Sequence, residues 1–312
     1  MSDATAPTET EPSLSAEACG RLMTYATFAS LSVALVLIAS KFGAWLATDS
    51  LSLLSTLIDS FLDAGASLIN LLAVRRALQP ADRYHRFGHG KAEPLAGLAQ
   101  AAFIFGSAAF LLFEAGEWLF RPRDIENTDI GYAVMVFAIL LTLVLVLFQK
   151  YVVRRTGSVA IRADSLHYQT DIMINGSVIL CLFLNANLGW RYADPLFATG
   201  IAAYILWGAW RIGHGAFHLI LDRELPDKDR RRIKEIVLAN PGVRGLHDMR
   251  TRSSGQSVFI QLHLEMDGHL TLFEAHEIAE DVMLAVERAF PGAEVLVHED
   301  PEGVAERRTI FK

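Results

Sequence analysis

The sequence predicts a bundle of six membrane-spanning helices followed by a small soluble α+β domain. Two observations support this fold class. The 312 residues are 52% hydrophobic, with a mean hydropathy of +0.30, and the apolar residues fall in long blocks typical of membrane spans. From about residue 222 the composition becomes that of a soluble domain, with patterns in the order α-β-β-α-β. That order favours an open sheet with helices on one face.

The predicted spans are joined mostly by short connections. Their ranges are about 22–47, 51–77, 92–119, 130–153, 158–186 and 193–214. The first two are separated by so few residues that they must be antiparallel neighbours. The fifth span starts with the polar sequence SVAIRADSLHYQTD and ends with an apolar run, so a plain hydropathy window would miss its first half.

The soluble part shows helix signals around 226–241 and 271–290, and strand signals in 242–254, 256–267 and 293–300. We therefore expect a membrane domain over 18–215 and a cytoplasmic domain over 216–301. The first 17 residues are polar and acidic, without the basic start of a signal peptide. We expect disordered tails over 1–17 and 302–312.

Lysine and arginine are concentrated in the connections after the second and fourth spans. They are Arg75, Arg76, Arg83, Arg86 and Lys91 in the first of these, and Lys150, Arg154, Arg155 and Arg162 in the second. The connections on the other side carry only Arg121, Arg123 and Arg191. The positive-inside rule then places both termini in the cytoplasm.

The net charge of −7 argues against a nucleic-acid partner. The two cysteines, Cys19 and Cys181, cannot build a disulfide framework. Signatures of common enzymes fail as well. The sequence HEIAE at 276–280 has Glu280 where a zincin needs its second histidine, and GHGKA at 88–92 lacks the first glycine and the Ser/Thr of a P-loop.

Two pairs of polar residues lie at membrane depth. Asp59 and Asp63 are four apart in the second span, and His167 and Asp171 are four apart in the fifth. Such a spacing is about one helical turn, or ~6 Å, so each pair shares a face. A carboxylate in the membrane costs about 2.5–3.5 kcal/mol. No lysine or arginine lies within a turn of either aspartate of the second span, and a bound metal cation would offset their charge.

The structural alternative is a set of buried groups that fixes helix packing, but two matched pairs on different spans favour a four-ligand metal site. Three carboxylates and one imidazole suit a borderline cation such as Zn²⁺, Cd²⁺, Fe²⁺, Co²⁺ or Mn²⁺. The lack of thiolates argues against Cu⁺, and the histidine argues against a purely hard Ca²⁺ or Mg²⁺ site. Ligand chemistry alone leaves Zn²⁺ and Fe²⁺ open.

Two further clusters lie outside the membrane. Asp82, His85 and His89 share one short connection, which is either a solvated polar loop or a weaker metal site that stiffens the loop. The soluble domain concentrates histidines and a carboxylate that predict a metal cluster. These are His247, His263, His276, His298 and Asp300. His214, His218 and His269 fit no cluster, and we interpret them as structural or surface residues.

Four segments resemble the cation diffusion facilitator family and, within it, the bacterial zinc/iron efflux transporters. They are DSLSLLSTLIDSFLDAGASL, ALQPADRYHRFGHGKAEPLA, RADSLHYQTDIMINGS and LDRELPD. The resemblance covers about residues 20–301. It implies a homodimer in the bacterial inner membrane, each protomer having six spans and a ferredoxin-like cytoplasmic domain. It also implies exchange of a divalent metal for protons.

By position, the resemblance makes Asp59, Asp63, His167 and Asp171 the transport site, and Asp82, His85 and His89 a loop site. It implies a cytoplasmic binuclear site with His247 and His263 on one metal, His276 and His298 on the other, and Asp300 bridging. Lys91 and Asp222 would form a charge interlock that holds the dimer. Zn²⁺ is the first expected cargo and regulatory ion, with Cd²⁺ and Fe²⁺ next.

Because the ligands bind metal only when deprotonated, metal and protons should compete at the transport site. An imidazole has a reference pKa of about 6.5, which makes His167 the natural proton carrier. Two other functions stay open from the sequence. One is a membrane-anchored metal sensor or scaffold without transport. The other is an intramembrane metallohydrolase, which would need an open coordination position that four protein ligands leave little room for.

Overall fold

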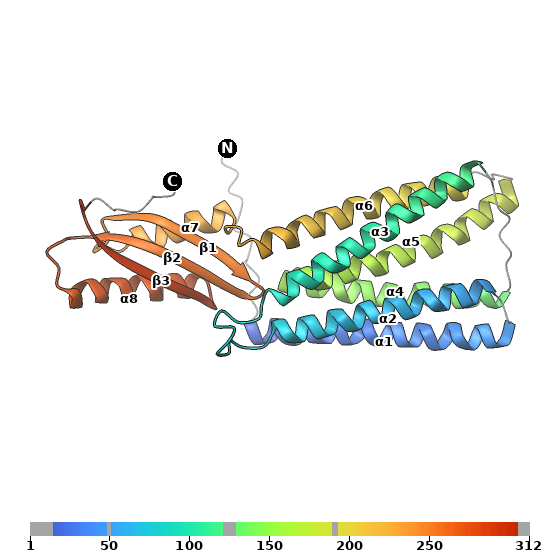
Figure 1. Ribbon diagram of the computed structural model, residues 1–312, viewed down its shortest axis with the longest axis horizontal. Coiled ribbons are helices and arrows are strands. Elements are labelled where there is room, and N and C mark those ends of the chain that lie inside the picture. Colours follow the sequence, from blue (N-terminus) through green and yellow to red (C-terminus); the bar gives the residue numbers. More distant parts are fainter. Residues whose placement is uncertain (1–14, 49–50, 121–128, 189–192, 305–312) are drawn as a thin grey trace, which may run out of the picture.

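The structure is a computed structural model that describes residues 15–48, 51–120, 129–188 and 193–304. It is elongated, with a helical bundle at one end and a small sheet domain at the other (Figure 1). The described part of the bundle consists of α1 (Ala16–Thr48), α2 (Leu51–Ala77), α3 (Ala92–Phe120), α4 (Asp129–Thr156), α5 (Val159–Leu188) and α6 (Ala193–Ile220). The predicted six-helix bundle is confirmed.

Five of these helices are long and apolar enough to cross a membrane by composition alone, within the ranges that the structure describes. The sixth is α5, whose first half carries Arg162, Asp164, His167 and Asp171. A hydropathy window overlooks α5 because these polar residues lower the mean hydropathy of its first half, the half that we predicted would be missed. Asp164 and His167 are both buried.

Two helix ends differ from the predicted spans. α1 begins at Ala16, inside the predicted tail, because Ser15 Oγ accepts a hydrogen bond from Ala18 N at 3.2 Å and caps the first turn. α6 continues to Ile220, past the apolar stretch on which its predicted end depended. Residues 1–14 and 305–312 of the predicted tails, and the connections with Arg121, Arg123 and Arg191, lie outside the described residues.

α3 and α6 pack closely through small side chains. Ala101 and Ala108 of α3 and Ala209 of α6 are almost fully buried in one core cluster. A Cβ added at Gly213 would be only 3.5 Å from Ala101 Cβ. Small residues allow helix backbones to approach in this way, which is how membrane helices gain packing contacts. These two helices therefore form a tightly matched pair.

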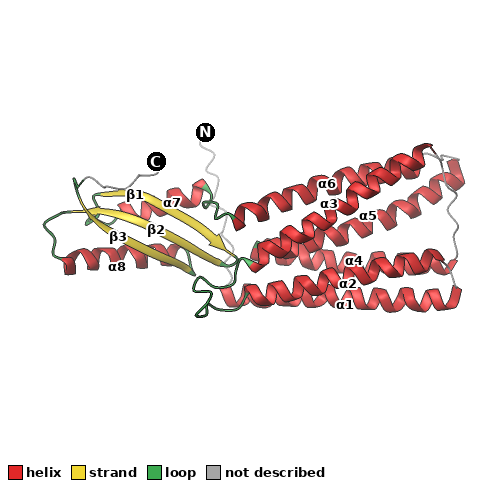
Figure 2. Ribbon diagram, in the orientation of Figure 1, coloured by secondary structure: helices red, strands yellow, loops and turns green. Residues whose placement is uncertain are grey.

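The sheet domain has the order α7 (Asp227–Leu238), β1 (Gly245–Ser254), β2 (Ser257–Met266), α8 (Leu272–Ala289) and β3 (Ala293–Pro301), as Figure 2 shows. β2 lies in the centre, antiparallel to β1 and parallel to β3. The parallel pair is joined through α8, as a crossover connection requires. The predicted αββαβ ferredoxin-like domain is confirmed.

The side chains of β2 alternate between the two faces of the sheet. Ile260, Leu262 and Leu264 are buried in a core that also contains Ile233 and Val237 of α7, together with Ala279, Val282 and Val286 of α8. Both helices therefore cover the same face. The intervening residues of β2, including His263, point to the opposite face, so the sheet presents them away from the apolar core.

The connection between α2 and α3 contacts the sheet domain directly. A Cβ added at Gly90 would lie 2.2 Å from the carbonyl oxygen of Ser254. The guanidinium of Arg252 lies 4.7 Å from the centre of the Phe87 ring, and Lys91 Nζ donates to Ile220 O at 3.1 Å. This connection thus joins the first residues of α3, the end of α6 and the turn between β1 and β2.

That turn also reaches the other side of the bundle. Gln256 Nε2 donates to Thr156 O at the end of α4, at 3.2 Å, and lies 3.7 Å from Met23 Sδ in α1. The beginning of α1, the end of α4 and the sheet domain therefore lie at the same end of the bundle.

Candidate metal centres

The two helices with the predicted intramembrane ligands face each other. His167 Nε2 of α5 lies 2.9 Å from Asp63 Oδ1 of α2. Asp63, His167 and Asp171 each offer a ligand atom, and these atoms lie within 4.8 Å of one another. Since two spans separated by about a hundred residues bring a carboxylate, an imidazole and a second carboxylate together, one ion can contact all three.

Asp59 stands at the same cavity, although it is outside this closest group. A cavity of about 690 Å³ is lined by all four predicted ligands and by residues of α3 and α6. From His167 it continues along Thr170 and Ile174 of α5, in the direction away from the sheet domain (Figure 1). Asp59 lies one turn beyond Asp63 in that direction and completes the acidic wall.

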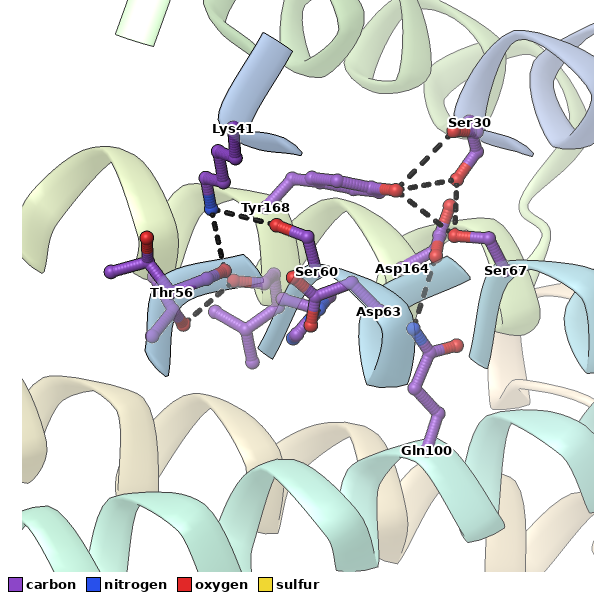
Figure 3. Close-up of polar contacts among 12 residues, drawn as sticks. Ser30, Lys41, Thr56, Ser60, Asp63, Ser67, Gln100, Asp164 and Tyr168 are labelled. Atoms are coloured by element: carbon purple, nitrogen blue, oxygen red, sulfur yellow. Dashed lines mark hydrogen bonds and ion pairs between the residues drawn. The ribbon is translucent and has the colours of Figure 1, made fainter. Parts of the chain in front are cut away.

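A cation from the first helix also approaches this region. Lys41 Nζ of α1 donates to Ser60 Oγ at 2.7 Å and to Thr56 O at 3.1 Å, as Figure 3 shows. Its ammonium also interacts electrostatically with Asp171, Asp63 and Asp59. α2 has no lysine or arginine within a turn of Asp59 or Asp63, so the nearby positive charge comes from a neighbouring helix.

A buried polar cluster closes the other side of the site. The carboxylate of Asp164, one turn before His167, accepts hydrogen bonds from Gln100 Nε2 at 3.1 Å and from Gln149 Nε2 at 2.7 Å. Nearby, the hydroxyls of Tyr168 and Ser67 are 2.9 Å apart (Figure 3). These groups come from α2, α3, α4 and α5, and they fill the interior between the cavity and the sheet-domain end of the bundle.

The loop cluster of Asp82, His85 and His89 is brought together as the spacing suggested. Asp82 Oδ1 accepts the backbone N–H of His85 at 2.7 Å and that of Tyr84 at 2.8 Å. His89 Nε2 lies 3.3 Å from the other carboxylate oxygen. The two backbone N–H groups, that of His85 foremost, hold the pKa of Asp82 below its usual value. The loop thus presents an ionised carboxylate between two imidazoles.

In the sheet domain, three histidines form one row across the strands. His247 of β1 pairs with His263 of β2, which in turn pairs with His298 of β3. Asp300 lies two residues beyond His298 and shares its face. Its carboxylate is 2.8 Å from His263 Nδ1, 3.2 Å from His298 Nε2 and 3.5 Å from His247 Nε2. His247, His263 and Asp300 meet the geometry for holding one ion.

A further carboxylate joins this row because β1 is irregular. The strand register shifts between His247 and Arg250, and Asp248 adopts a positive φ of 42°. Adjacent strand residues normally face opposite ways, but the bulge brings Asp248 Oδ2 to 3.9 Å from His263 Nε2. A hydrogen bond from Arg250 lowers the pKa of Asp248. No sequence pattern indicates this residue beyond its place next to His247.

Three of the residues that the resemblance selected lie outside the clusters. His276 lies on the exposed surface of α8, where Glu280 Oε1 is 4.0 Å from its ring nitrogen, and it is not in the three-residue group. Lys91 and Asp222 do form an ion pair, with 2.9 Å between Nζ and Oδ2. This pair lies within one chain and links the start of α3 to the residues that follow α6.

Comparisons with known proteins agree with this architecture. Residues 27–221 match the family model described as the cation efflux transmembrane domain, and residues 225–302 match the cation efflux protein cytoplasmic domain. The cation-efflux pump FieF of Salmonella arizonae is 50% identical over 288 residues, which cover 92% of this chain and 96% of that protein. FieF of Klebsiella pneumoniae is 50% identical over 285 residues, covering 91% and 95%. On the strength of both domains, the chain belongs to the cation efflux, or cation diffusion facilitator, family.

Proposed function

We propose that the chain exports divalent metal ions from the cytoplasm in exchange for protons. The observation that carries this proposal is the meeting of Asp63, His167 and Asp171 beside a cavity that also contains Asp59. Four ligands of this kind at membrane depth have little value for packing but suit a passing cation. The relatives named cation-efflux pumps support the direction of transport.

Zn²⁺ is the cargo that we expect first, with Cd²⁺ and Fe²⁺ as further substrates. An imidazole with three carboxylates fits borderline divalent cations better than hard ones. The geometry supports this choice, because His167 stands between carboxylates contributed by both helices and can share an ion with either of them.

Proton coupling follows from the ligands themselves. Metal binds only to deprotonated ligands, so an ion that enters from the cytoplasm must displace protons from the site. After the helices move, protons from outside displace the ion. The cavity beside His167 extends away from the sheet domain, as expected for the exit side of such a cycle. The polar cluster around Asp164 occupies the entry side.

In this proposal the sheet domain is a regulatory domain that senses metal on the cytoplasmic side. An ion held by His247, His263 and Asp300 would favour one arrangement of a homodimer, and so bias transport if it binds one state better. The loop cluster would add a third site. Both termini then lie in the cytoplasm, and the bundle spans the inner membrane.

The test is uptake into proteoliposomes under an imposed pH gradient, with Zn²⁺, Cd²⁺, Fe²⁺ and Mn²⁺ compared. We expect proton-driven Zn²⁺ flux from the wild type, and its loss in Asp63→Ala. Asp229→Ala removes a partly buried aspartate of α7 that belongs to none of the metal clusters, so it is the matched control and should transport normally. Equal flux with and without the pH gradient would refute proton antiport, and equal flux in Asp63→Ala would refute the site.

The alternative is a membrane-anchored metal sensor without transport, favoured by the dense His/Asp row on the sheet. It predicts metal binding with no flux in the same vesicles. The regulatory role is tested separately by Zn²⁺ uptake against cytoplasmic-side metal in the double variant His263→Ala, His298→Ala. If uptake depends on cytoplasmic-side metal in the same way in this variant and in the wild type, the regulatory role is refuted, but transport is not.

A further inference from the structure

A pair of histidines on α6 lies outside all three metal clusters. His214 and His218 are four residues apart, so their side chains lie one above the other on the same face of the helix. Their Nε2 atoms are 3.1 Å apart, and their ring centres are separated by 4.3 Å. The same ring nitrogen of each imidazole therefore lies at hydrogen-bond distance from that of the other, beside the helix.

The separation of these nitrogens suits chelation of one ion. Zinc–imidazole bonds are about 2.0–2.1 Å long. With nitrogens 3.1 Å apart, an ion equidistant from both would have an N–metal–N angle of about 100°, between the tetrahedral and the square or octahedral values. The helix backbone already holds both residues one turn apart, so little rearrangement is needed for both to bind.

The position of the pair leaves both imidazoles accessible to a metal ion. His214 lies on the exposed face of α6, within the stretch Pro195–Ile220 that is apolar enough to span a membrane. Two imidazoles on such a face must be hydrated, coordinated or, as in this structure, hydrogen-bonded to each other. The neighbouring rings are aromatic, with Trp210 6.1 Å from His214 and Phe217 6.2 Å from His218. These two neighbours are not acidic, so they cannot form an ion pair with the histidines.

The pair is also distinct from the intramembrane centre. The cavity beside His167 is lined on α6 by Ile205, nine residues before His214, which is about 13 Å along a helix axis. On its other side, the carbonyl of His218 accepts the backbone N–H of Arg223 at 3.0 Å, where the helix ends and the chain passes to the sheet domain. The pair therefore marks the last turns of α6.

We propose that His214 and His218 form an additional two-histidine site for a divalent transition-metal ion, with water in the remaining positions. Imidazole ligands without carboxylates suit Zn²⁺, Cu²⁺, Ni²⁺ or Co²⁺. A bound ion would cross-link two successive turns and so stabilise the end of α6 just before the sheet domain. This site does not depend on the proposed transport, because neither residue touches the intramembrane cavity.

The test uses the full chain in detergent, with Zn²⁺ as the probe and diethylpyrocarbonate to modify accessible histidines. Peptide mass spectrometry then reports the modification of each histidine as Zn²⁺ is added. We expect His214 and His218 to be protected together, with one shared midpoint. His269, an exposed histidine outside every cluster, is the internal control and should stay reactive.

The variant His218→Gln separates a chelate from independent binding. Losing one arm should raise the Zn²⁺ concentration that half-protects His214 by at least about tenfold, because the second ligand no longer acts at high effective concentration. Protection of His263 should be unchanged. The same midpoint for His214 in wild type and variant would overturn the chelate.

A second measurement covers the case in which both histidines resist modification without metal. The number of Zn²⁺ ions bound at saturation by the full chain should fall by one per chain in His214→Gln and in His218→Gln, but not in His269→Gln. An unchanged number in both variants, together with unchanged reactivity, would refute the site. Each variant is a single substitution on an exposed face, so folding is checked by comparing elution volumes.

Discussion

Lys41 and Ser60 join the first two helices beside the acidic cavity, with 2.7 Å between Nζ and Oγ. Ser60 directly follows Asp59 in α2, so the hydrogen bond holds a positive charge next to the wall of carboxylates. A fixed charge here neutralises part of the acidic site when no metal is bound, and it repels a divalent ion when one arrives.

Removal of this charge should tighten metal binding at the intramembrane site. In a partly hydrated interior, the repulsion between the Lys41 ammonium and a nearby metal ion costs about 1 kcal/mol of binding free energy. The Lys41→Met variant should therefore bind Zn²⁺ roughly fivefold more tightly and release it more slowly. Titration calorimetry of the variant, in a chain that also carries His263→Ala and His89→Ala, measures the affinity. Lys41→Arg keeps the charge and should resemble the parent. Weaker binding in Lys41→Met would mean that Lys41 acts by positioning α2 instead.

Phe103 of α3 separates two cavities. Like Leu62 of α2, it lines the cavity beside His167 and also a second one, of about 370 Å³, between α2 and α3. Its ring centre is 6.3 Å from that of His167. Because Gly65, Asn70 and Gln100 also line the second cavity, it lies toward the sheet-domain end of the site.

Shortening this side chain should connect the two cavities and admit water past His167. We expect Phe103→Ala to conduct protons without metal, several times faster than the wild type, in proteoliposomes with a pH-sensitive dye inside. Phe110→Ala removes a ring that lines only the first cavity and is the control. If the leak rates of the two variants are equal, Phe103 does not form the barrier.

Gly90 should tolerate no side chain. Its added Cβ would meet the backbone of Ser254 at 2.2 Å, and a backbone atom cannot rotate away. We expect Gly90→Ala to destabilise the protein by about 1–3 kcal/mol, measured by thermal unfolding in detergent with tryptophan fluorescence. Gly106→Ala in α3, where the added Cβ meets nothing within 4 Å, should be neutral or slightly stabilising. A similar melting temperature for both would show that the contact yields at little cost.

Acidification to about pH 5 should leave Asp82 of the loop cluster ionised. The pKa of Asp82 is lowered in the folded loop. Its stabilising interactions are therefore fully present above the unfolded value of about 3.9, and they are lost only as the pH falls through the lower folded value. Between about pH 5 and 8 the carboxylate stays ionised. Asp82→Asn should therefore weaken loop metal binding by a similar factor across this range. A weakening confined to the acidic end would contradict the assignment.

Local patterns predicted much of this protein. The spacing of Asp59 with Asp63, and of His167 with Asp171, follows helical geometry, so each pair could be assigned to a face before the helices were placed. The same holds for His298 and Asp300 on a strand, where residues two apart share a side. The order of helices and strands in the sheet domain could also be predicted, because apolar residues recur about every 3.6 residues in a helix and every second residue in a strand.

Contacts between distant segments could not be predicted in the same way. Lys41 reaches α2 from another helix, and Asp164 finds amide partners on α3 and α4; neither relationship leaves a spacing in the sequence. Asp248 joins the histidine row only through a bulge. His214 and His218 have the helical spacing, but they fit no cluster in the sequence, which indicated only structural or surface residues; the 3.1 Å between their nitrogens depends on side-chain positions.

The turn between β1 and β2 contacts the bundle at two separate places. Ser254 and Gly255 rest on Gly90 at the foot of α3, while Gln256 reaches the ends of α4 and α1. If α3 moves relative to α1 and α4, this turn must therefore be displaced or lose one of these contacts. The histidine row crosses the same strands. An ion that bridges β1 and β2 would therefore make this turn more rigid and oppose movement of the helices that it contacts.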